Sequence, residues 1–155
     1  MNKELINVEV NLYYIKSDFN SIVLRLCKKL TEKRVLIKLN DDEEMQNLDK
    51  FLWTKEKDSF LPHKTFLEKQ YDKDKLVLFY GDSPKSLDIE KFEIMLVSPN
   101  VKIKKLVSLK KFFLFSNTSF DKKIYESICS KLKNKVNTFK CFYEYDLFKW
   151  KLVSN

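Results

Sequence analysis

The 155-residue sequence contains one glycine, one histidine and three cysteines, and it has no long uninterrupted apolar run. A membrane helix needs about 20 consecutive apolar residues, so no membrane association is expected. Three widely spaced cysteines and a lone histidine assemble neither a disulfide framework nor a zinc site, so we expect reduced thiols, no metal and no cofactor. The first residues lack the basic and apolar segments of a secretory signal, and a cytoplasmic protein is expected.

The scarcity of glycine also argues against an enzyme. A nucleotide-binding turn after the first predicted strand requires glycines, and the sequence there is YIKSDFN. No nucleophile-elbow motif frames a serine, and His63, which follows Pro62 in a loop, suits a hydrogen-bonded structural role better than a catalytic one. An enzyme is therefore the least favoured class, and no catalytic residue is predicted.

Positive charge is concentrated in the last third of the chain. Residues 1–100 hold 17 basic and 18 acidic residues, a net charge of −1, whereas residues 101–155 hold 13 basic and 4 acidic residues, a net charge of +9. A general abundance of lysine does not explain this asymmetry. A functional basic surface is favoured over a merely solvated one.

Alternating strand and helix signals predict one α/β domain over residues 1–155, with a mostly parallel central sheet flanked by helices. Helices are expected after the caps Ser17 or Asp18 and Asn40 or Asp41, and a long one from about residue 119 or 121 to about 139. Residues 54–66 read as a loop, and residues 98–110 are undecided between loop and short helix. Strands are predicted over residues 7–14, 34–39, 75–80, 92–97, 111–116 and 141–150.

The long C-terminal helix would present a mixed strip on one flank. Steps of three and four residues place Cys129, Lys133, Val136 and Lys140 together, so that a small apolar patch stands between lysines. Such a strip suits a ligand that is acidic and ends in an apolar group. The alternative is a solvated helix edge, and periodicity alone does not separate the two.

A second unusual feature is the concentration of Trp53, Phe60, Leu61 and Pro62 in the irregular segment. These side chains either anchor the loop as a small satellite core or are the exposed anchors of a protein interface. The final segment FKCFYEYDLFKWK interleaves aromatic and basic residues, which leaves direct single-stranded nucleic-acid binding by the basic C-terminal third as the alternative function.

Several of these motifs together resemble one family. The segments KRVLIKL, LDKFLWTKEKDSFLPH and GDSP, the basic helix and the late Trp150 resemble the chi subunit of bacterial DNA polymerase III holoenzyme. The resemblance implies a Rossmann-like three-layer fold and a non-catalytic accessory subunit of this DNA-directed DNA polymerase, acting in DNA replication.

The resemblance also implies partners and sites. Chi-like proteins bind the acidic C-terminal tail of single-stranded DNA-binding protein and link it to the clamp loader, so contact with DNA is mainly indirect. The tail site would fall on Lys133 and Val136, with Lys140 and Cys129 beside them. The psi subunit, or a substitute replication or repair partner, would contact Trp53 and Phe60, together with the adjoining Leu61 and Pro62.

Overall fold

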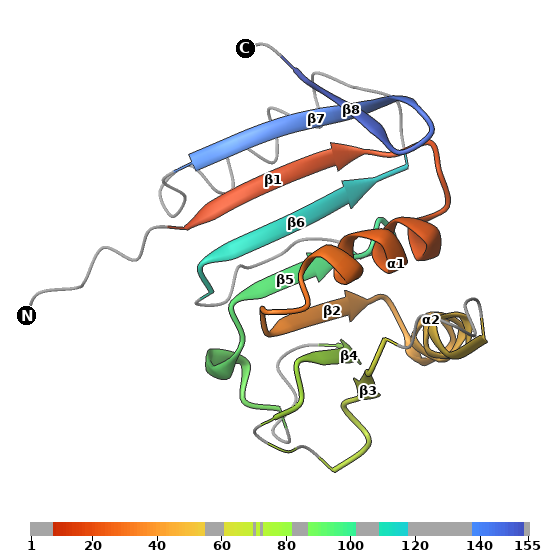
Figure 1. Ribbon diagram of the computed structural model, residues 1–155, viewed down its shortest axis with the longest axis vertical. Coiled ribbons are helices and arrows are strands. Elements are labelled where there is room, and N and C mark those ends of the chain that lie inside the picture. Colours follow the sequence, from red (N-terminus) through yellow and green to blue (C-terminus); the bar gives the residue numbers. More distant parts are fainter. Residues whose placement is uncertain are drawn as a thin grey trace, which may run out of the picture.

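A mostly parallel sheet forms the centre of the molecule. The structure is a computed structural model, and it describes residues 8–54, 61–69, 71, 73–81, 87–101, 109–117 and 138–153. Within these ranges the sheet has eight strands in the order β3-β4-β2-β5-β6-β1-β7-β8 (Figure 1). Every neighbouring pair is parallel except β7 and β8, which are antiparallel. The strands are β1 (Glu9–Tyr14), β2 (Val35–Leu39), β3 (Lys64–Thr65), β4 (Leu76–Tyr80), β5 (Ile94–Val97), β6 (Lys111–Ser116), β7 (Thr138–Asp146) and β8 (Lys149–Leu152).

The two described α-helices begin at the residues that the sequence indicates. Helix α1 (Phe19–Lys29) is capped by Asp18, whose carboxylate accepts a 3.0 Å hydrogen bond from the Ser21 N–H. Helix α2 (Asp42–Thr54) follows Asp41, whose Oδ1 accepts a 2.9 Å hydrogen bond from the Glu44 N–H. Each cap satisfies an N–H that has no partner within its own helix. The predicted caps are confirmed, and the chain has an α/β, Rossmann-like fold.

Both faces of the sheet are buried, as expected for parallel strands. One core cluster packs α1 and α2 against one face, and a second cluster covers the other face. Alternation along β2 shows the division, because Val35 and Ile37 belong to the first cluster and Leu36 to the second. Helix α1 crosses the middle of the sheet, and on its face neither described helix covers β1, β7 and β8 (Figure 1).

The order of the strands was not evident from the sequence. Although β1, α1 and β2 follow one another, β5 and β6 lie between β1 and β2 in the sheet. Two short elements were also missed: β3 lies within the predicted loop, and a 3₁₀ helix, η1 (Ile89–Lys91), precedes β5. Both are too short to produce a recognisable hydrophobic period.

Two predictions for the C-terminal region are wrong. The long helix was expected to run to about Phe139, but β7 begins at Thr138, so Phe139 and Lys140 are strand residues paired with Val10 and Asn11 of β1. The single final strand is instead a β7–β8 hairpin. In its turn Phe148 has φ 57°, a conformation that residues other than glycine seldom adopt. Because the turn has no glycine at this position, the sequence did not indicate a hairpin.

A buried carboxylate fixes this hairpin to the rest of the fold. Glu144 is 1% exposed and accepts hydrogen bonds from the N–H groups of Lys16 at 2.6 Å, Ser17 at 2.7 Å and Phe148 at 2.8 Å, and from the Ser17 hydroxyl. Burial alone would raise its pKa, but the hydrogen bonds from Ser17, Phe148 and Lys16 outweigh burial and hold the pKa of Glu144 below its usual range. The ionised carboxylate therefore joins the β1–α1 connection to the β7–β8 turn.

Candidate partner-binding site

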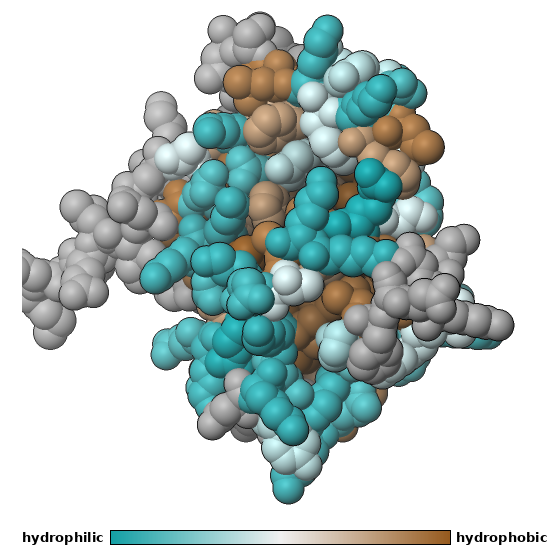
Figure 2. All heavy atoms as spheres, viewed as in Figure 1, coloured by the Kyte–Doolittle hydropathy of each residue, from teal (hydrophilic) through white to brown (hydrophobic). Residues whose placement is uncertain are grey.

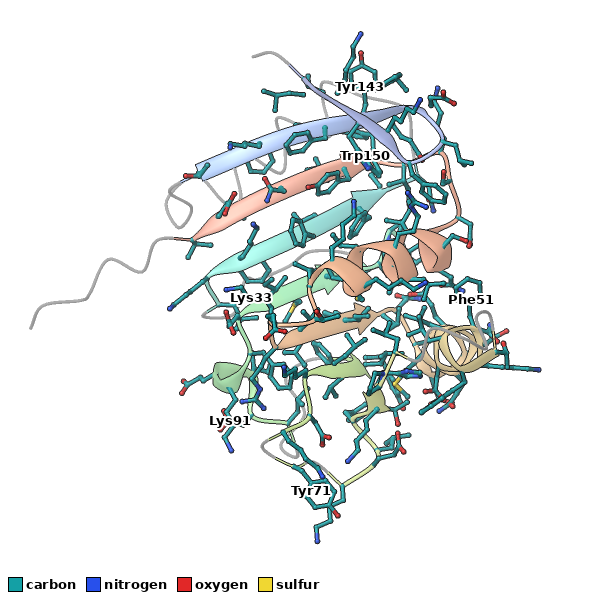
Figure 3. All side chains as sticks on the ribbon, viewed as in Figure 1. Lys33, Phe51, Tyr71, Lys91, Tyr143 and Trp150 are labelled. Atoms are coloured by element: carbon teal, nitrogen blue, oxygen red, sulfur yellow. The ribbon has the colours of Figure 1, made fainter. Side chains whose placement is uncertain are left out.

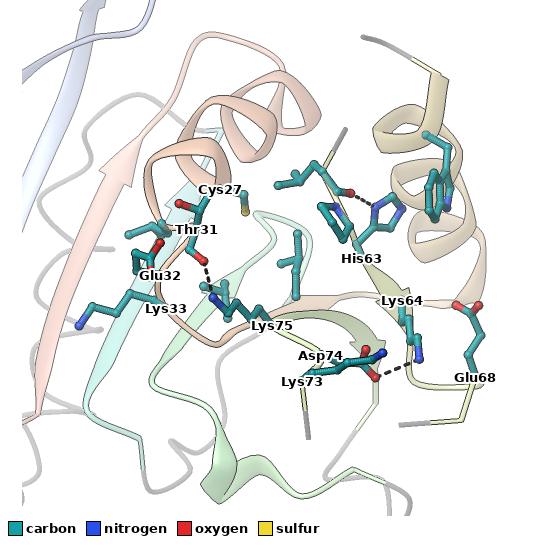
Figure 4. Close-up of a pocket in the computed structure, with 16 residues that line it drawn as sticks. Cys27, Thr31, Glu32, Lys33, His63, Lys64, Glu68, Lys73, Asp74 and Lys75 are labelled. Atoms are coloured by element: carbon teal, nitrogen blue, oxygen red, sulfur yellow. Dashed lines mark hydrogen bonds and ion pairs between the residues drawn. The ribbon is translucent and has the colours of Figure 1, made fainter. Parts of the chain in front are cut away.

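A cavity of about 680 Å³ lies between the C-terminal end of α1 and the segment that leads into β3 (Figure 4). Its volume is in the range of sites that hold a small molecule or several side chains of a partner. It has an apolar floor and a charged rim. The floor includes Cys27, Leu30, Val35, Leu61 and Leu76, and the rim includes Glu32, Lys33, Lys64, Glu68, Lys73, Asp74 and Lys75.

Trp53 stands at the edge of this cavity and is held against a buried histidine. The last turn of α2 carries Trp53, which is 48% exposed, and its ring centroid lies 4.4 Å from that of His63. His63 is only 5% exposed; Nδ1 lies 2.8 Å from the Leu61 carbonyl oxygen and Nε2 lies 3.0 Å from Asp49 Oδ1. The histidine thus ties the loop to α2 and supports one face of the tryptophan ring, leaving the other part of the ring exposed.

The charged rim contains lysines and carboxylates, and one lysine and one carboxylate form an ion pair. Lys64 Nζ lies 3.0 Å from Asp74 Oδ2, and Lys75 Nζ donates a 3.3 Å hydrogen bond to the Thr31 carbonyl (Figure 4). Burial by itself would raise the pKa of Asp74, but hydrogen bonds from the Tyr71 N–H and the Lys64 ammonium, with the charges of Lys64 and Lys73, hold that pKa below its usual range. Asp74 is therefore ionised at neutral pH.

The described lining of the cavity is suited to binding. Burial raises the pKa of the Cys27 thiol to about 12, so this side chain is a neutral part of the floor and not a nucleophile. Within the described ranges no group of three or more histidine, cysteine, aspartate or glutamate residues is placed to hold a metal ion. The arrangement suits binding through an apolar side chain that enters the floor while charges meet the rim.

Three of the four residues predicted for a partner interface meet at this cavity. Trp53, Leu61 and Pro62 all line it, whereas Phe60 lies outside the described residues. Pro62 is exposed, but Leu61 is 8% exposed and belongs to the core cluster under α1 and α2. Each of the two interpretations of this segment therefore applies to some of its residues. Leu61 is part of the core and anchors the loop, whereas Trp53 and Pro62 are accessible to a partner.

The predicted tail site falls mostly outside the described residues. This holds for Cys129, Lys133 and Val136. Lys140 is exposed on β7 opposite Asn11, on the face of the sheet that carries Tyr13 and Phe142. The assumption that Lys140 continues a helical strip is wrong, because the chain is already extended and paired with β1 at this position.

Sequence reasoning missed the lysines around the cavity. Lys33, Lys64, Lys73 and Lys75 come from separate segments that converge only in the folded chain. Their individual sequence contexts resemble those of ordinary surface lysines, because acidic residues occur nearby. No local pattern would have selected them.

A second basic and aromatic cavity was missed for the same reason. Arg25 and Lys29 on α1 line it with Phe148 and Trp150 of the hairpin, about 120 residues later in the chain. The sequence singled out the aromatic and basic composition of the hairpin, but not the helix that faces it.

Comparison with known proteins agrees with this architecture. None of the helices in the described residues is long and apolar enough to cross a membrane. A comparison with curated proteins returned no match. The family model for the DNA polymerase III chi subunit, HolC, matches residues 9–116, which run from β1 to β6 and include Trp53, Leu61 and Pro62. Since this match covers more than half of the chain, the strands, the helices and the cavity described above are those of a member of the DNA polymerase III chi subunit family, an accessory subunit in DNA replication.

Proposed function

We propose that this accessory subunit is an adaptor that joins single-stranded DNA-binding protein to the clamp-loader assembly without catalysing a reaction itself. The observation that carries the proposal is the half-exposed Trp53 at the mouth of an apolar cavity within the segment that matches the chi family. A large, fixed aromatic ring beside an apolar hollow is typical of the centre of a protein interface. The cavity accordingly receives the psi subunit or a substitute replication or repair partner.

The shape of the site supports one mode of binding for that partner. Trp53 is supported from behind by His63, so the ring is already ordered and little side-chain entropy is lost on binding. The partner inserts an apolar side chain toward Leu30 and Leu76, and its charged flanks meet the rim at Lys33 and Lys75.

The tail of single-stranded DNA-binding protein binds elsewhere in this proposal. Lys133 and Lys140 meet its carboxylates, and Val136 and Cys129 meet its apolar terminus. The support for this site is the net charge of +9 over residues 101–155 and the exposure of Lys140. Attraction between this region and an acidic peptide will decrease with salt, whereas contact with the apolar terminus will not.

The docking of the partner is tested by reconstitution of the clamp loader from the same organism with a tagged chain. Trp53→Ala is expected to lower the amount of clamp-loader subunits that co-purify at least tenfold, as for an interface hot spot. Tyr145→Ala is the matched control, because Tyr145 is 49% exposed against 48% for Trp53 and does not line the cavity. Co-purification that is unchanged in Trp53→Ala refutes this part of the proposal.

The tail site is tested by fluorescence anisotropy with a labelled peptide from the C-terminus of the organism's single-stranded DNA-binding protein. Lys133→Glu should abolish saturable binding, and Lys50→Glu, the same change on an exposed position of α2, should not. A peptide without its terminal apolar residue should also bind weakly. Equal effects of Lys133→Glu and Lys50→Glu would reduce the interaction to nonspecific attraction between opposite charges.

A further inference from the structure

The face of the sheet beside α1 carries a row of aromatic side chains. Phe115, at one end of the row, is buried against Phe19 of α1, whereas Phe142 and Trp150 are partly exposed. Tyr13 on β1 lies at the centre of this row, with ring centroids 5.0 Å from Phe142 on β7 and 5.5 Å from Phe115 on β6. Both pairs are stacked, with 14° and 21° between the ring planes, so the faces of the Tyr13 ring pack against Phe142 and Phe115. Trp150 on β8, labelled in Figure 3, has its ring centroid 5.0 Å from that of Tyr13, with 75° between the ring planes.

A small cavity opens where this row meets α1. It has a volume of about 240 Å³, and four of the eight residues that line it are aromatic: Tyr13, Phe115, Phe148 and Trp150. Phe142, Phe148 and Trp150 are only half-buried, and hydrophobic side chains reach the surface among hydrophilic ones at the β7–β8 end of the molecule (Figure 2). Flat walls and this volume suit one planar ring inserted from outside.

The charged residues described at this cavity are both basic. Arg25 and Lys29 are exposed one helical turn apart on α1, and none of the described lining residues is acidic. The Arg25 guanidinium lies 4.3 Å from the centroid of the Phe148 ring, and among the described residues neither cation has an acidic partner within ion-pair distance. The nearby Glu144 carboxylate is buried and already engaged by four donors.

Exposed Lys140 extends the positive charge along the same face. It pairs with Asn11 two residues before the Tyr13–Phe142 pair, and alternate residues of a strand share a face. Arg25 and Lys29 therefore lie at one side of the aromatic row, and Lys140 lies farther along it. The positive charges therefore extend along the aromatic row, and a ligand that contacts all three cations must be longer than one amino-acid side chain.

We propose that this surface binds single-stranded nucleic acid directly, with one base in the cavity against Trp150 of β8 and with phosphates at Arg25 and Lys29. Cations that follow a strand's phosphates, combined with aromatic rings that accept bases, are the common elements of single-strand recognition. An open sheet face with aromatic side chains is one of the scaffolds on which they occur. The contact is additional to the adaptor function: it uses neither Trp53 nor Lys133, and it shares Lys140 with the proposed tail site.

The backbone around the cavity favours nucleic acid over an acidic peptide. Extended peptides bind largely through main-chain hydrogen bonds to an exposed strand edge. Here β1 is paired on both sides, with β6 and β7, and β7 is paired with β1 and β8. Of these strands β8 alone has an open edge, and hydrogen bonds to that edge would lie in the plane of the sheet and not over its aromatic face. Recognition at this face therefore depends on rings and cations, which match bases and phosphates.

The test is fluorescence anisotropy of the full chain with a labelled oligo-dT of about 12 nucleotides, over a series of salt concentrations. The variants Arg25→Gln and Lys29→Gln should each weaken binding several-fold and reduce the slope of log affinity against log salt by roughly 0.7. Lys50→Gln is the matched control, since it removes the same charge from an exposed helical position outside the cavity. Trp150→Leu should weaken binding roughly tenfold, the effect of losing one base–ring stack.

Three outcomes would overturn the proposal. The first is no oligo-dT binding by the wild type at low salt. The second is equal loss of affinity in Lys50→Gln and Arg25→Gln, which would mean attraction to net charge without a site. The third is saturable binding of an acidic peptide that Arg25→Gln weakens, with no oligo-dT binding, which would make the occupant a protein. Because Arg25 and Lys29 are exposed, their variants remain informative even if Trp150→Leu does not fold.

Discussion

Replacement of Glu144 by glutamine tests whether the buried carboxylate holds the C-terminal hairpin on the sheet. Three backbone N–H groups and one hydroxyl donate to its two oxygens, and the residue is 1% exposed. Glutamine keeps one carbonyl oxygen but places an amide donor where two of these donors converge. Hydrogen bonds to a charged group contribute about 1.5–3 kcal/mol each, and buried donors left without a partner add to the loss.

We expect Glu144→Gln to lower the free energy of unfolding by about 3 kcal/mol, since the lost bonds share one group and do not add fully. For a chain of this size that corresponds to a decrease in Tm of roughly 6–12 °C. Asp146→Asn is the control: its carboxylate is 67% exposed and lies 3.9 Å from Lys149 Nζ. An exposed pair of this kind contributes about 0.5 kcal/mol or less.

The same substitution predicts a pH dependence. The pKa of Glu144 is lowered in the folded state, so its contribution is fully present above the unfolded value of about 4.3 and is lost as pH falls through the folded pKa. The gap in stability between wild type and Glu144→Gln should therefore be constant near neutral pH and narrow in acid. Denaturant unfolding at a series of pH values measures it. A Tm change no larger than that of Asp146→Asn would refute the assigned role of the carboxylate.

Three further predictions concern separate parts of the fold. Gly81→Ala should lower the free energy of unfolding by about 1–2 kcal/mol, because φ at this residue is +81°, although a Cβ there would meet nothing within 4 Å. Gly81→Asn should lower it less, since asparagine tolerates this conformation better than alanine. Denaturant unfolding measures both, and equal losses would contradict a purely backbone effect. In a Cys129→Ser background, Cys27 should resist a thiol reagent at pH 8 until the chain unfolds, since burial raises its pKa to about 12; rapid labelling of the native chain at Cys27, located by peptide mapping, would contradict this. Leu61→Ala should lower stability by about 2–4 kcal/mol and Trp53→Ala by less, because Leu61 is 8% and Trp53 48% exposed; the reverse order in Tm would contradict their assignment to core and surface.

Local signals were sufficient for most of the regular structure. The apolar period of α1, the acidic caps of α1 and α2, and the apolar runs of β2, β4, β5 and β6 each depend on residues close together in the chain. Gly81 was also evident, because a lone glycine after a strand indicates a backbone conformation that side chains disfavour. The family resemblance followed from the same local segments, and the match over residues 9–116 confirms it.

The C-terminal hairpin could not be predicted in this way. Its turn contains neither glycine nor proline, and Phe148 adopts a positive φ while its N–H donates to the Glu144 carboxylate and its ring lies beside the Arg25 guanidinium. These partners come from different elements, so no local preference indicates them. The helix signal that continued to Phe139 was overridden for the same reason, because pairing with β1 begins at Thr138.

Local patterns were enough to infer an α/β fold, a basic last third and an unusual apolar group at Trp53, Leu61 and Pro62. Which of these three residues is buried became evident in the folded chain, because exposure depends on what α1, α2 and β3 place around the loop. The tertiary structure also decided that Arg25 of α1 faces Trp150 of β8. Strand order brings them together, and strand order is set by contacts between segments distant in the chain, which hydrophobic periodicity cannot specify.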